Sequence, residues 1–243
     1  MIKLICFLKR NQALERDEFH RHWRETHGGL FADSQAMKNY IVRYEQNHRL
    51  EADYRRDGDA PWDQQGFDGV TVIWYESLDA FAEMSQDSYY QQYVVPDEQQ
   101  LLHGAQQHWL IAGRENVIVD KPGARENAGA KLLCLLRRNA ALEKDAFHRH
   151  WLEHHGGLFQ NVENLNKDIM AYDQNHRLEE DYVMGPERTW DGVTEQWFES
   201  IDRFYQSLHE PEQKTLVEPD VAHMLDPTGT QFIMSALPEV IIG

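Results

Sequence analysis

Apolar and polar residues follow a pattern that occurs twice along this chain, with the same order of elements. The first copy opens with an apolar stretch near residues 2–9, which predicts a buried strand, and turns at Asn11. A helix is predicted over residues 15–27, because Phe19 and Trp23 recur at helical spacing and the first turn is acidic. Each copy therefore begins with a strand and a helix.

Two more strands are predicted after this helix. In the stretch 39–49, Tyr40, Tyr44 and His48 alternate with their neighbours, as on one face of a strand. An Asp-Gly pair then precedes a third strand over residues 70–75. The tyrosines and the histidine are expected on the same face of the sheet.

The remainder of the copy predicts two helices and a last strand. The stretch Glu76-Ser77-Leu78-Asp79 caps the first helix, and the second begins after Pro96 and ends near His103. A fourth strand is predicted over residues 108–119, and the polar, aperiodic residues 120–129 predict a linker.

The second copy repeats this plan, so the chain divides into domains 1–119 and 130–243. Each copy reads β-α-β-β-α-β, the ferredoxin-like α+β arrangement in which helices cover one face of an antiparallel sheet. The other, apolar face must also be covered. We expect the two repeats to pack sheet to sheet as a two-sheet barrel with pseudo-twofold symmetry within one chain.

A twelve-residue stretch in the first helix is the strongest sign of the duplication. The stretch from His20 to Phe31 returns from His148 to Phe159 with ten of the twelve positions identical. Two glycines follow His27, which predicts a left-handed residue and the end of the helix there. The helix dipole would favour a protonated imidazole and burial a neutral one, a balance suited to a general acid or base.

Several motifs together point to a known family. A helix with His-x-x-Trp-x-x-x-His-Gly, a strand with Tyr-x-Gln-Asn-His, and Asp-Gly-Val before a strand that ends in Trp occur in both copies. This combination resembles the EthD-domain family of the dimeric α+β barrel superfamily, over nearly the whole chain. The resemblance implies a fused dimer. Similar proteins include accessory components of ether degradation, and cofactor-free dehydratases, decarboxylases, cyclases and lactone isomerases acting on aromatic or polyketide-like molecules.

Histidines and tyrosines on the helix and second strand are the candidate acid and base groups. The candidate catalytic residues are His27, His155, Tyr44, Tyr172, His48, His176 and Glu195. The candidate substrate-binding residues are Tyr40, Trp23, Trp151, Trp74, Trp197 and Asp168. The plainer alternative is that these histidines and tryptophans are core residues bonded to the backbone.

The copies differ at two positions that bear on the site. Tyr40 corresponds to Asp168, and Val72 corresponds to Glu195. A buried carboxylate is costly unless it is solvated or paired, so we expect Glu195 at a polar cavity or at a sheet edge. Our hypothesis is that Glu195 orients His155 and that the second half holds the working site.

Composition narrows the possible partners. The net charge of −17 argues against nucleic acid, and no apolar run is long enough to span a bilayer. Cys6 and Cys134 stand at equivalent points of two buried-looking strands, which fits core packing in a reducing cytoplasm. We expect a cytoplasmic protein with a small aromatic ligand, and a further homodimer remains open.

No cofactor is expected. Thirteen histidines invite a metal, but the chain lacks His-Glu-x-x-His, and His20 and His22 point to nearly opposite sides of a helix. Histidine is a common haem ligand, yet nothing here distinguishes such a ligand. Nucleotide-binding glycine motifs are also absent from the sequence.

The sequence thus predicts a cofactor-independent lyase or isomerase acting on a small aromatic or polyketide-like molecule, with histidine as acid and base. The reactions open to it are dehydration, decarboxylation, retro-aldol cleavage and lactone rearrangement. The alternative is a non-enzymatic ligand-binding or accessory protein of an aromatic- or ether-degrading oxygenase system.

Overall fold

The computed structural model describes residues 1–104, 108–185 and 190–243. The chain forms two compact units. The first comprises Met1–Arg114 together with Pro238–Gly243, and the second comprises Glu115–Leu237.

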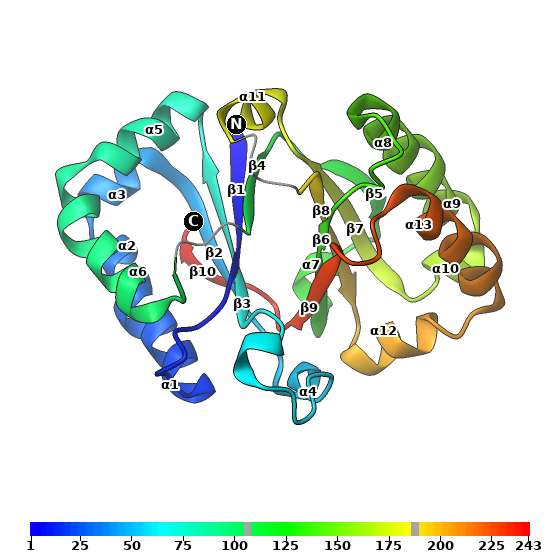
Figure 1. Cartoon of the computed structure of the whole chain (residues 1–243), viewed down its shortest axis with the longest axis horizontal. Coiled ribbons are helices and arrows are strands. Elements are labelled where there is room, and N and C mark those ends of the chain that lie inside the picture. The colour runs from blue at the N-terminus through cyan, green and yellow to red at the C-terminus, as the bar shows by residue number, and fades with distance from the viewer. Residues whose placement is uncertain (105–107, 186–189) are drawn as a thin grey trace. The chain divides into compact units, whose positions relative to one another are not determined.

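The first unit is a five-stranded antiparallel sheet, in the order β10-β2-β3-β1-β4, with most of its helices on one face (Figure 1). Its strands are β1 (Ile2–Leu8), β2 (Ile41–His48), β3 (Gly69–Tyr75), β4 (Trp109–Ala112) and β10 (Glu239–Ile242). Its helices are α1 (Arg16–Arg21), the π-helical η1 (His22–His27), α2 (Gly28–Ala32), α3 (Gln35–Tyr40), α4 (Glu51–Tyr54), the 3-10 turn η2 (Trp62–Gln64), α5 (Leu78–Gln86), the π-helical η3 (Tyr90–Val94) and α6 (Val95–Leu101).

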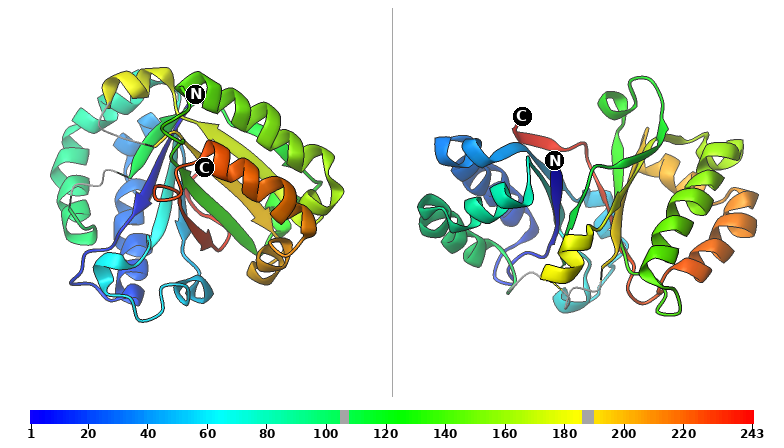
Figure 2. Two further views of the ribbon diagram at one scale, coloured as in Figure 1. Left: turned by 45° about the vertical axis from the view of Figure 1, so that its right-hand side comes forward. Right: turned by 90° about the horizontal axis from the view of Figure 1, so that it is seen from above.

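The second unit repeats this layout, with the sheet order β5-β7-β8-β6-β9 (Figure 2). Its strands are β5 (Asn116–Asp120), β6 (Ala130–Leu136), β7 (Ile169–His176), β8 (Gly192–Phe198) and β9 (Gln231–Ser235). Its helices are α7 (Ala124–Asn127), α8 (Lys144–His150), the π-helical η4 (Trp151–His155), α9 (Gly156–Asn161), α10 (Glu163–Asn166), α11 (Glu179–Met184), α12 (Ile201–Ser207), the π-helical η5 (Gln213–Val217) and α13 (Glu218–Met224).

The α+β class and the ferredoxin-like repeat are therefore confirmed, whereas the predicted single strand over 108–119 is wrong. That stretch forms two strands: β4 pairs with β1 in the first unit, and β5 pairs with β7 in the second. In return, β10 pairs with β2 of the first unit. Each sheet thus takes its fifth, edge strand from the end of the other repeat's sequence. The predicted linker 120–129 also contains α7 and the last residue of β5.

The prediction that the first helix ends at His27 is wrong. Gly28 has φ −57° and continues the helix in a right-handed conformation into α2. The wide π turn leaves the Trp23 carbonyl within reach of β2, where it accepts a hydrogen bond from Gln46 Nε2 at 2.8 Å. A Cβ on Gly28 would lie 3.2 Å from Ile241 Cδ1 and 3.3 Å from Gln46 Nε2. Glycine is needed here for close approach and not for a helix stop.

Two other predicted boundaries shift. Tyr40 is the last residue of α3 and lies outside the strand predicted over 39–49. The helix predicted to begin after Pro96 begins earlier, because η3 runs directly into α6. Proline lacks an N–H to donate to the preceding turn, and the π-helical turn just before it accommodates that loss. The cap at Ser77 is confirmed, since its hydroxyl accepts from Ala80 N at 3.1 Å.

The core of each unit locks the tryptophan of the first helix against a glycine of the sheet. Trp23 and Trp151 are fully buried. A Cβ on Gly69 would lie 2.3 Å from Trp23 Cζ3, and one on Gly192 would lie 2.4 Å from Trp151 Cζ3. Only glycine lets either ring lie flat on the strand.

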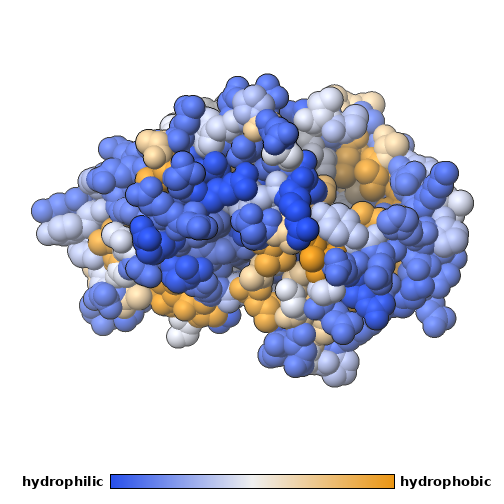
Figure 3. All heavy atoms as spheres, turned by 90° about the horizontal axis from the view of Figure 1, so that it is seen from below, coloured by the Kyte–Doolittle hydropathy of each residue, from blue (hydrophilic) through white to orange (hydrophobic). Residues whose placement is uncertain are grey.

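The surface is mainly hydrophilic on the face drawn in Figure 3, in keeping with the net charge of −17. Among the described residues, every helix is too short or too polar to cross a membrane.

Candidate functional site

A cavity of about 310 Å³ lies in the first unit between the sheet and its helices. Most of its wall is apolar, from strand residues such as Leu4 and Ile73 and helix residues such as Phe31 and Phe81. The polar groups that line it are His27, Tyr44, Thr71, Tyr75, Tyr90 and Glu98. An apolar cavity with a few converging polar groups is the usual form of a small-molecule site.

Strand and helix periodicity bring these groups together. Thr71 and Tyr75 lie on the same face of β3, because alternate residues of a strand point the same way. Trp23 and His27, four residues apart in the first helix, both line the cavity. The structure thus gathers three of the predicted site residues, Trp23, His27 and Tyr44, around one space.

His27 is held by a carboxylate at the start of α6. Its Nδ1 donates to Asp97 Oδ2 at 2.8 Å, and His22 Nε2 donates to Asp97 Oδ1 at 2.6 Å. Burial alone would raise the pKa of Asp97, but the bonds from these imidazoles keep it below its usual value. With Nδ1 occupied, Nε2 is the His27 nitrogen left for chemistry in the cavity. A carboxylate in this place fixes the tautomer and stabilises the imidazolium.

The next residue along α6 supplies a second carboxyl group. Tyr90 Oη donates to Glu98 Oε1 at 3.2 Å. Burial raises the pKa of Glu98 and is only partly opposed by His27 and the Tyr90 hydrogen bond. The pKa of Tyr90 is likewise raised by burial and by Glu98. Glu98 is therefore biased towards its protonated form, and Tyr90 remains a neutral phenol.

The hydroxyl of Tyr75 makes no hydrogen bond with the residues that the structure describes. Its side chain is fully buried and lines the cavity, and its Oη has no hydrogen-bond partner among the described residues. Burial raises its pKa well above the ordinary value, so it stays a donor. A buried polar group without a partner costs free energy, which a bound ligand with an acceptor oxygen would recover.

Tyr44 differs from Tyr75 because its hydroxyl is already held. Trp23 Nε1 donates to it at 3.3 Å and Gln46 Nε2 at 3.1 Å. Burial nevertheless raises its pKa. This phenol is a fixed part of the wall.

His48 does not line the cavity, although its ring centroid lies 4.3 Å from that of Trp23, which does. Its Nδ1 contacts His20 Nδ1 at 2.9 Å, and His20 Nε2 contacts Tyr54 Oη at 3.0 Å. Burial, assisted by the charge on His20, lowers the pKa of His48 to about 3. The same chain of bonds joins His176, His148 and Tyr182 in the second unit. The network occurs in both units, and burial keeps His48 and His176 neutral near pH 7 by lowering the pKa of each to about 3.

The predicted binding residues at the start and end of the strands do not reach the cavity. Trp74 and Trp197 alternate with the cavity-facing positions and lie on the opposite face, where lysines stand over their rings. Tyr40 Oη donates to Asp87 at 3.3 Å, and Asp168 lies 3.8 Å from Arg203.

The predicted pairing of Glu195 with His155 is wrong. Glu195 is buried on the central strand β8, on the face opposite the helices, 2.5 Å from Lys131 Nζ and 2.9 Å from Asn175 Nδ2. His155 lies on the helical side and donates from Nδ1 to Asp220 at 2.7 Å. Glu195 is tolerated in the sheet because it is ion-paired, and neither a cavity nor an edge explains it.

The second unit keeps the imidazole and carboxylate but changes the groups around them. Its Tyr172 is held by Gln174 Nε2 at 3.0 Å, and burial raises the pKa of Tyr172 to about 12. The sequence offset of 123 gives the counterparts of the other polar residues. Tyr75, Tyr90 and Glu98 correspond to Phe198, Gln213 and Val221. The hydroxyl and carboxyl donors are therefore features of the first unit, and we place the candidate site there.

Sequence reasoning missed Asp97, Glu98, Tyr75 and Tyr90, although signals for them existed. Pro96-Asp97 recurs as Pro219-Asp220, a repeated acidic residue at a helix start. The other three are polar in one copy and different in the other, the same signal that drew attention to Glu195. They lie 48 to 71 positions after His27 in the sequence, so no local pattern connects them with it.

The sequence matches the EthD domain family over residues 11–104 and again over residues 139–228. A search of curated proteins finds no match. Among solved structures, the fold is similar to that of an anthrone oxidase-like protein, with a TM-score of 0.60, 6% identity, and coverage of 98% of this chain and 91% of that one.

Two other solved structures are similar over almost the whole chain. A candidate monooxygenase from Fusobacterium nucleatum subsp. nucleatum gives a TM-score of 0.58 at 7% identity, covering 98% of this chain and 93% of that one. A mutant chlorite dismutase from Candidatus Nitrospira defluvii gives 0.51 at 12% identity, covering 97% and 91%. At such identities the likeness concerns the fold alone. The two domain matches together span most of the sequence, and the chain belongs to the EthD-domain family, with two copies of the domain.

Proposed function

We propose that the cavity of the first unit binds a small aromatic ketone or phenol and catalyses proton transfer on it without a cofactor, as a lyase or isomerase. The observation that carries this proposal is the pairing of the His27–Asp97 dyad with the unpartnered Tyr75 hydroxyl in one apolar cavity. A volume of about 310 Å³ suits a molecule of one to three fused rings.

The chemistry begins with a base and ends with an acid. His27 Nε2 takes a proton from a carbon next to the substrate carbonyl, and the bonding electrons move onto the carbonyl oxygen. Asp97 stabilises the resulting imidazolium through Nδ1. The proton then returns to a different carbon in an isomerase. In a lyase, the enolate instead expels a leaving group from the adjacent carbon and the imidazolium protonates it.

The negative oxygen formed in the first step needs hydrogen-bond donors. Tyr75 supplies a neutral phenol hydroxyl, and Glu98, whose pKa is raised by burial, supplies a second donor when it is protonated. A phenol and a protonated carboxyl in an apolar site form a known kind of oxyanion hole. The apolar wall strengthens these bonds by excluding water.

The test uses 2-tetralone, a two-ring ketone with acidic hydrogens beside the carbonyl. Exchange of these hydrogens for deuterium in D₂O, followed by ¹H NMR, reports base catalysis without requiring the natural substrate. We expect the wild-type protein to accelerate exchange, and His27→Ala to reduce the acceleration about 10²- to 10⁴-fold. The matched control is His155→Ala, which removes the equivalent imidazole of the second unit and should leave exchange within about twofold of wild type.

Binding of 2-tetralone is measured in parallel by quenching of tryptophan fluorescence. Binding without accelerated exchange would contradict the enzyme and favour the alternative, a ligand-binding or accessory protein. Equal losses in the two alanine variants would contradict the placement of the site in the first unit.

A further inference from the structure

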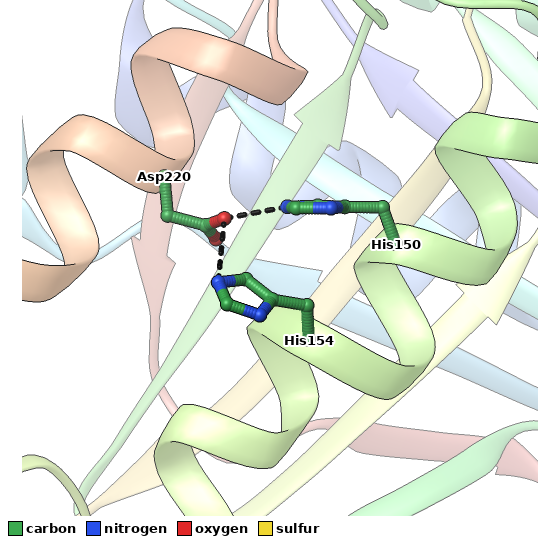
Figure 4. A group of neighbouring side chains, drawn as sticks. All are labelled: His150, His154 and Asp220. Atoms are coloured by element: carbon green, nitrogen blue, oxygen red, sulfur yellow. Dashed lines mark hydrogen bonds and ion pairs between the residues drawn. The ribbon is translucent and has the colours of Figure 1, made fainter.

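Three side chains of the second unit converge at its surface (Figure 4). His150 Nε2, His154 Nε2 and Asp220 Oδ1 all lie within 4.8 Å of one another. Asp220 Oδ1 is 2.5 Å from His150 Nε2 and 3.5 Å from His154 Nε2. The two histidines belong to the first helix of the second repeat, and the aspartate belongs to α13.

The helix places the two imidazoles on the same side. His150 and His154 are four residues apart, a spacing that brings side chains together on one helix face. Their ring centroids are 4.7 Å apart. The centroid of His223, from the last turn of α13, is 5.1 Å from that of His150, and all three rings line one surface depression.

The first unit shows which of these residues the fold requires. Asp97 accepts from His22 and His27 just as Asp220 accepts from His150 and His155. The pairing of aspartate with those histidines is therefore part of the common scaffold.

The common scaffold does not explain the imidazoles of His154 and His223. The positions of His154 and His223 are occupied in the first repeat by Thr26 and Gln100. The same scaffold forms with threonine and glutamine there, so these two histidines are additions made only in the second repeat.

We propose that His150, His154 and Asp220 bind a divalent transition metal of the zinc class, with His223 within reach as a fourth ligand. Imidazole nitrogen and carboxylate oxygen are the ligands that zinc prefers when thiolates are absent. Asp220 is already fixed through Oδ2 by His155, as the outer partners of metal ligands commonly are.

The site is open to solvent on one side. His154 is 59% exposed and can turn towards an incoming ion, whereas Asp220 is only 4% exposed and anchors the cluster. The metal would replace the hydrogen bond that now joins His150 and Asp220, and the two groups would separate slightly to reach bond lengths of about 2.0–2.2 Å. Binding should therefore release protons and weaken as the solution is acidified.

The test is calorimetric titration of the chelator-treated full-length protein with Zn²⁺. We expect one tight equivalent in wild type, and at least a tenfold weaker affinity at that site in His154→Thr. This variant carries the residue that the first repeat has at the same place, so its fold should be kept. His209→Ala, which removes an exposed histidine bonded to Tyr205 O, is the matched control and should bind as wild type does.

Two further measurements test the ligand set. Co²⁺ in place of Zn²⁺ should give visible absorption bands of a low-coordinate nitrogen and oxygen site in wild type, and His154→Thr should lose them. His223→Gln, again the residue of the first repeat, should weaken Zn²⁺ less than His154→Thr does. Equal Zn²⁺ affinity and stoichiometry in wild type and His154→Thr, or no tight equivalent in wild type, would overturn the proposal.

Discussion

The two units share a framework and differ in what they place inside it. In both, a buried tryptophan lies against a sheet glycine, a glutamine bonds the carbonyl of that tryptophan, and a histidine donates to an aspartate. In both, a His–His–Tyr chain joins the end of the second strand to the first helix and to the short helix that follows that strand, α4 or α11. These common features hold the fold.

The differences fall on the cavity and on one surface cluster. The first unit has Tyr75 and Glu98 where the second has Phe198 and Val221, and the second has His154 where the first has Thr26. Buried donors and carboxyls are unfavourable without a partner, so a unit that needs only stability would discard them. The unmatched polar residues therefore distinguish the proposed sites of the two units, although Glu195, also unmatched, is explained by its ion pair with Lys131.

The largest expected effect is a difference in activity between Asp97→Asn and Asp220→Asn. Asp97→Asn should lower the proposed exchange activity about 10²- to 10⁴-fold, because an amide cannot hold His27 in the basic tautomer. Asp220→Asn, the same change in the second unit, should leave activity within about twofold of wild type. Rates and thermal melts are measured together, and similar melting losses with very different rates are expected. Two similar rate losses would break the functional distinction between the units.

The sequence predicted the fold because the evidence for it is local and occurs twice. Apolar alternation, the Asp-Gly turn and the cap at Ser77 each depend on a few neighbouring residues. The exchange of the edge strands β5 and β10 escaped prediction. Apolar alternation indicates that residues 108–119 are extended, but it carries no information on which sheet each half joins.

The candidate site was predicted only in part, for a similar reason. His27, Trp23 and Tyr44 are in a recurring motif and were found. Glu98 and Tyr75 come from another helix and strand, and only the folded chain brings them to the imidazole. The role predicted for Glu195 is wrong because its partner is the buried Lys131 of the neighbouring strand, and only strand pairing brings the two side chains together.

The second largest expected effect is a loss of stability that should be equal in the two units. Gly69→Ala and Gly192→Ala each force a methyl group into a buried indole ring, at 2.3 Å and 2.4 Å in the present geometry. Overpacking of this kind costs typically about 1–3 kcal/mol, and the rigidity of a buried tryptophan places the expected loss towards the upper end. Chemical denaturation measures it. A large loss in one variant and none in the other would show that the shared framework does not carry equal stability in both units.

Acidification should reduce the stability of both units through their buried histidine pairs. Burial lowers the pKa of His48 and of His176 to about 3, far below the ordinary 6.5. The unfolded chain therefore binds more protons than the native protein below about pH 6.5, and stability present above that pH is lost as pH falls towards 3. His48→Gln and His176→Gln should each reduce the steepness of this loss between pH 6.5 and 4, to a similar extent, in denaturation series. Unequal reductions would mean that the two networks are not energetically equivalent.

The smallest effect concerns a group that only the first unit has. Burial raises the pKa of Glu98 above 4.5, so the native protein keeps this proton to higher pH than the unfolded chain does. The sign is opposite to that of the histidines: stability is fully present below pH 4.5 and decreases as pH rises through the native pKa. Glu98→Gln removes this decrease while keeping a similar shape, so its stability relative to wild type should rise as the pH increases above 4.5. The matched control is Val221→Ile in the second unit, which adds no ionisable group and should show no pH dependence relative to wild type.

Parallel curves for Glu98→Gln and wild type would mean that Glu98 is ionised as readily in the native protein as in the unfolded chain. It would then be unable to donate a hydrogen bond to an enolate oxygen at neutral pH, and Tyr75 would be left as the donor in the proposed mechanism.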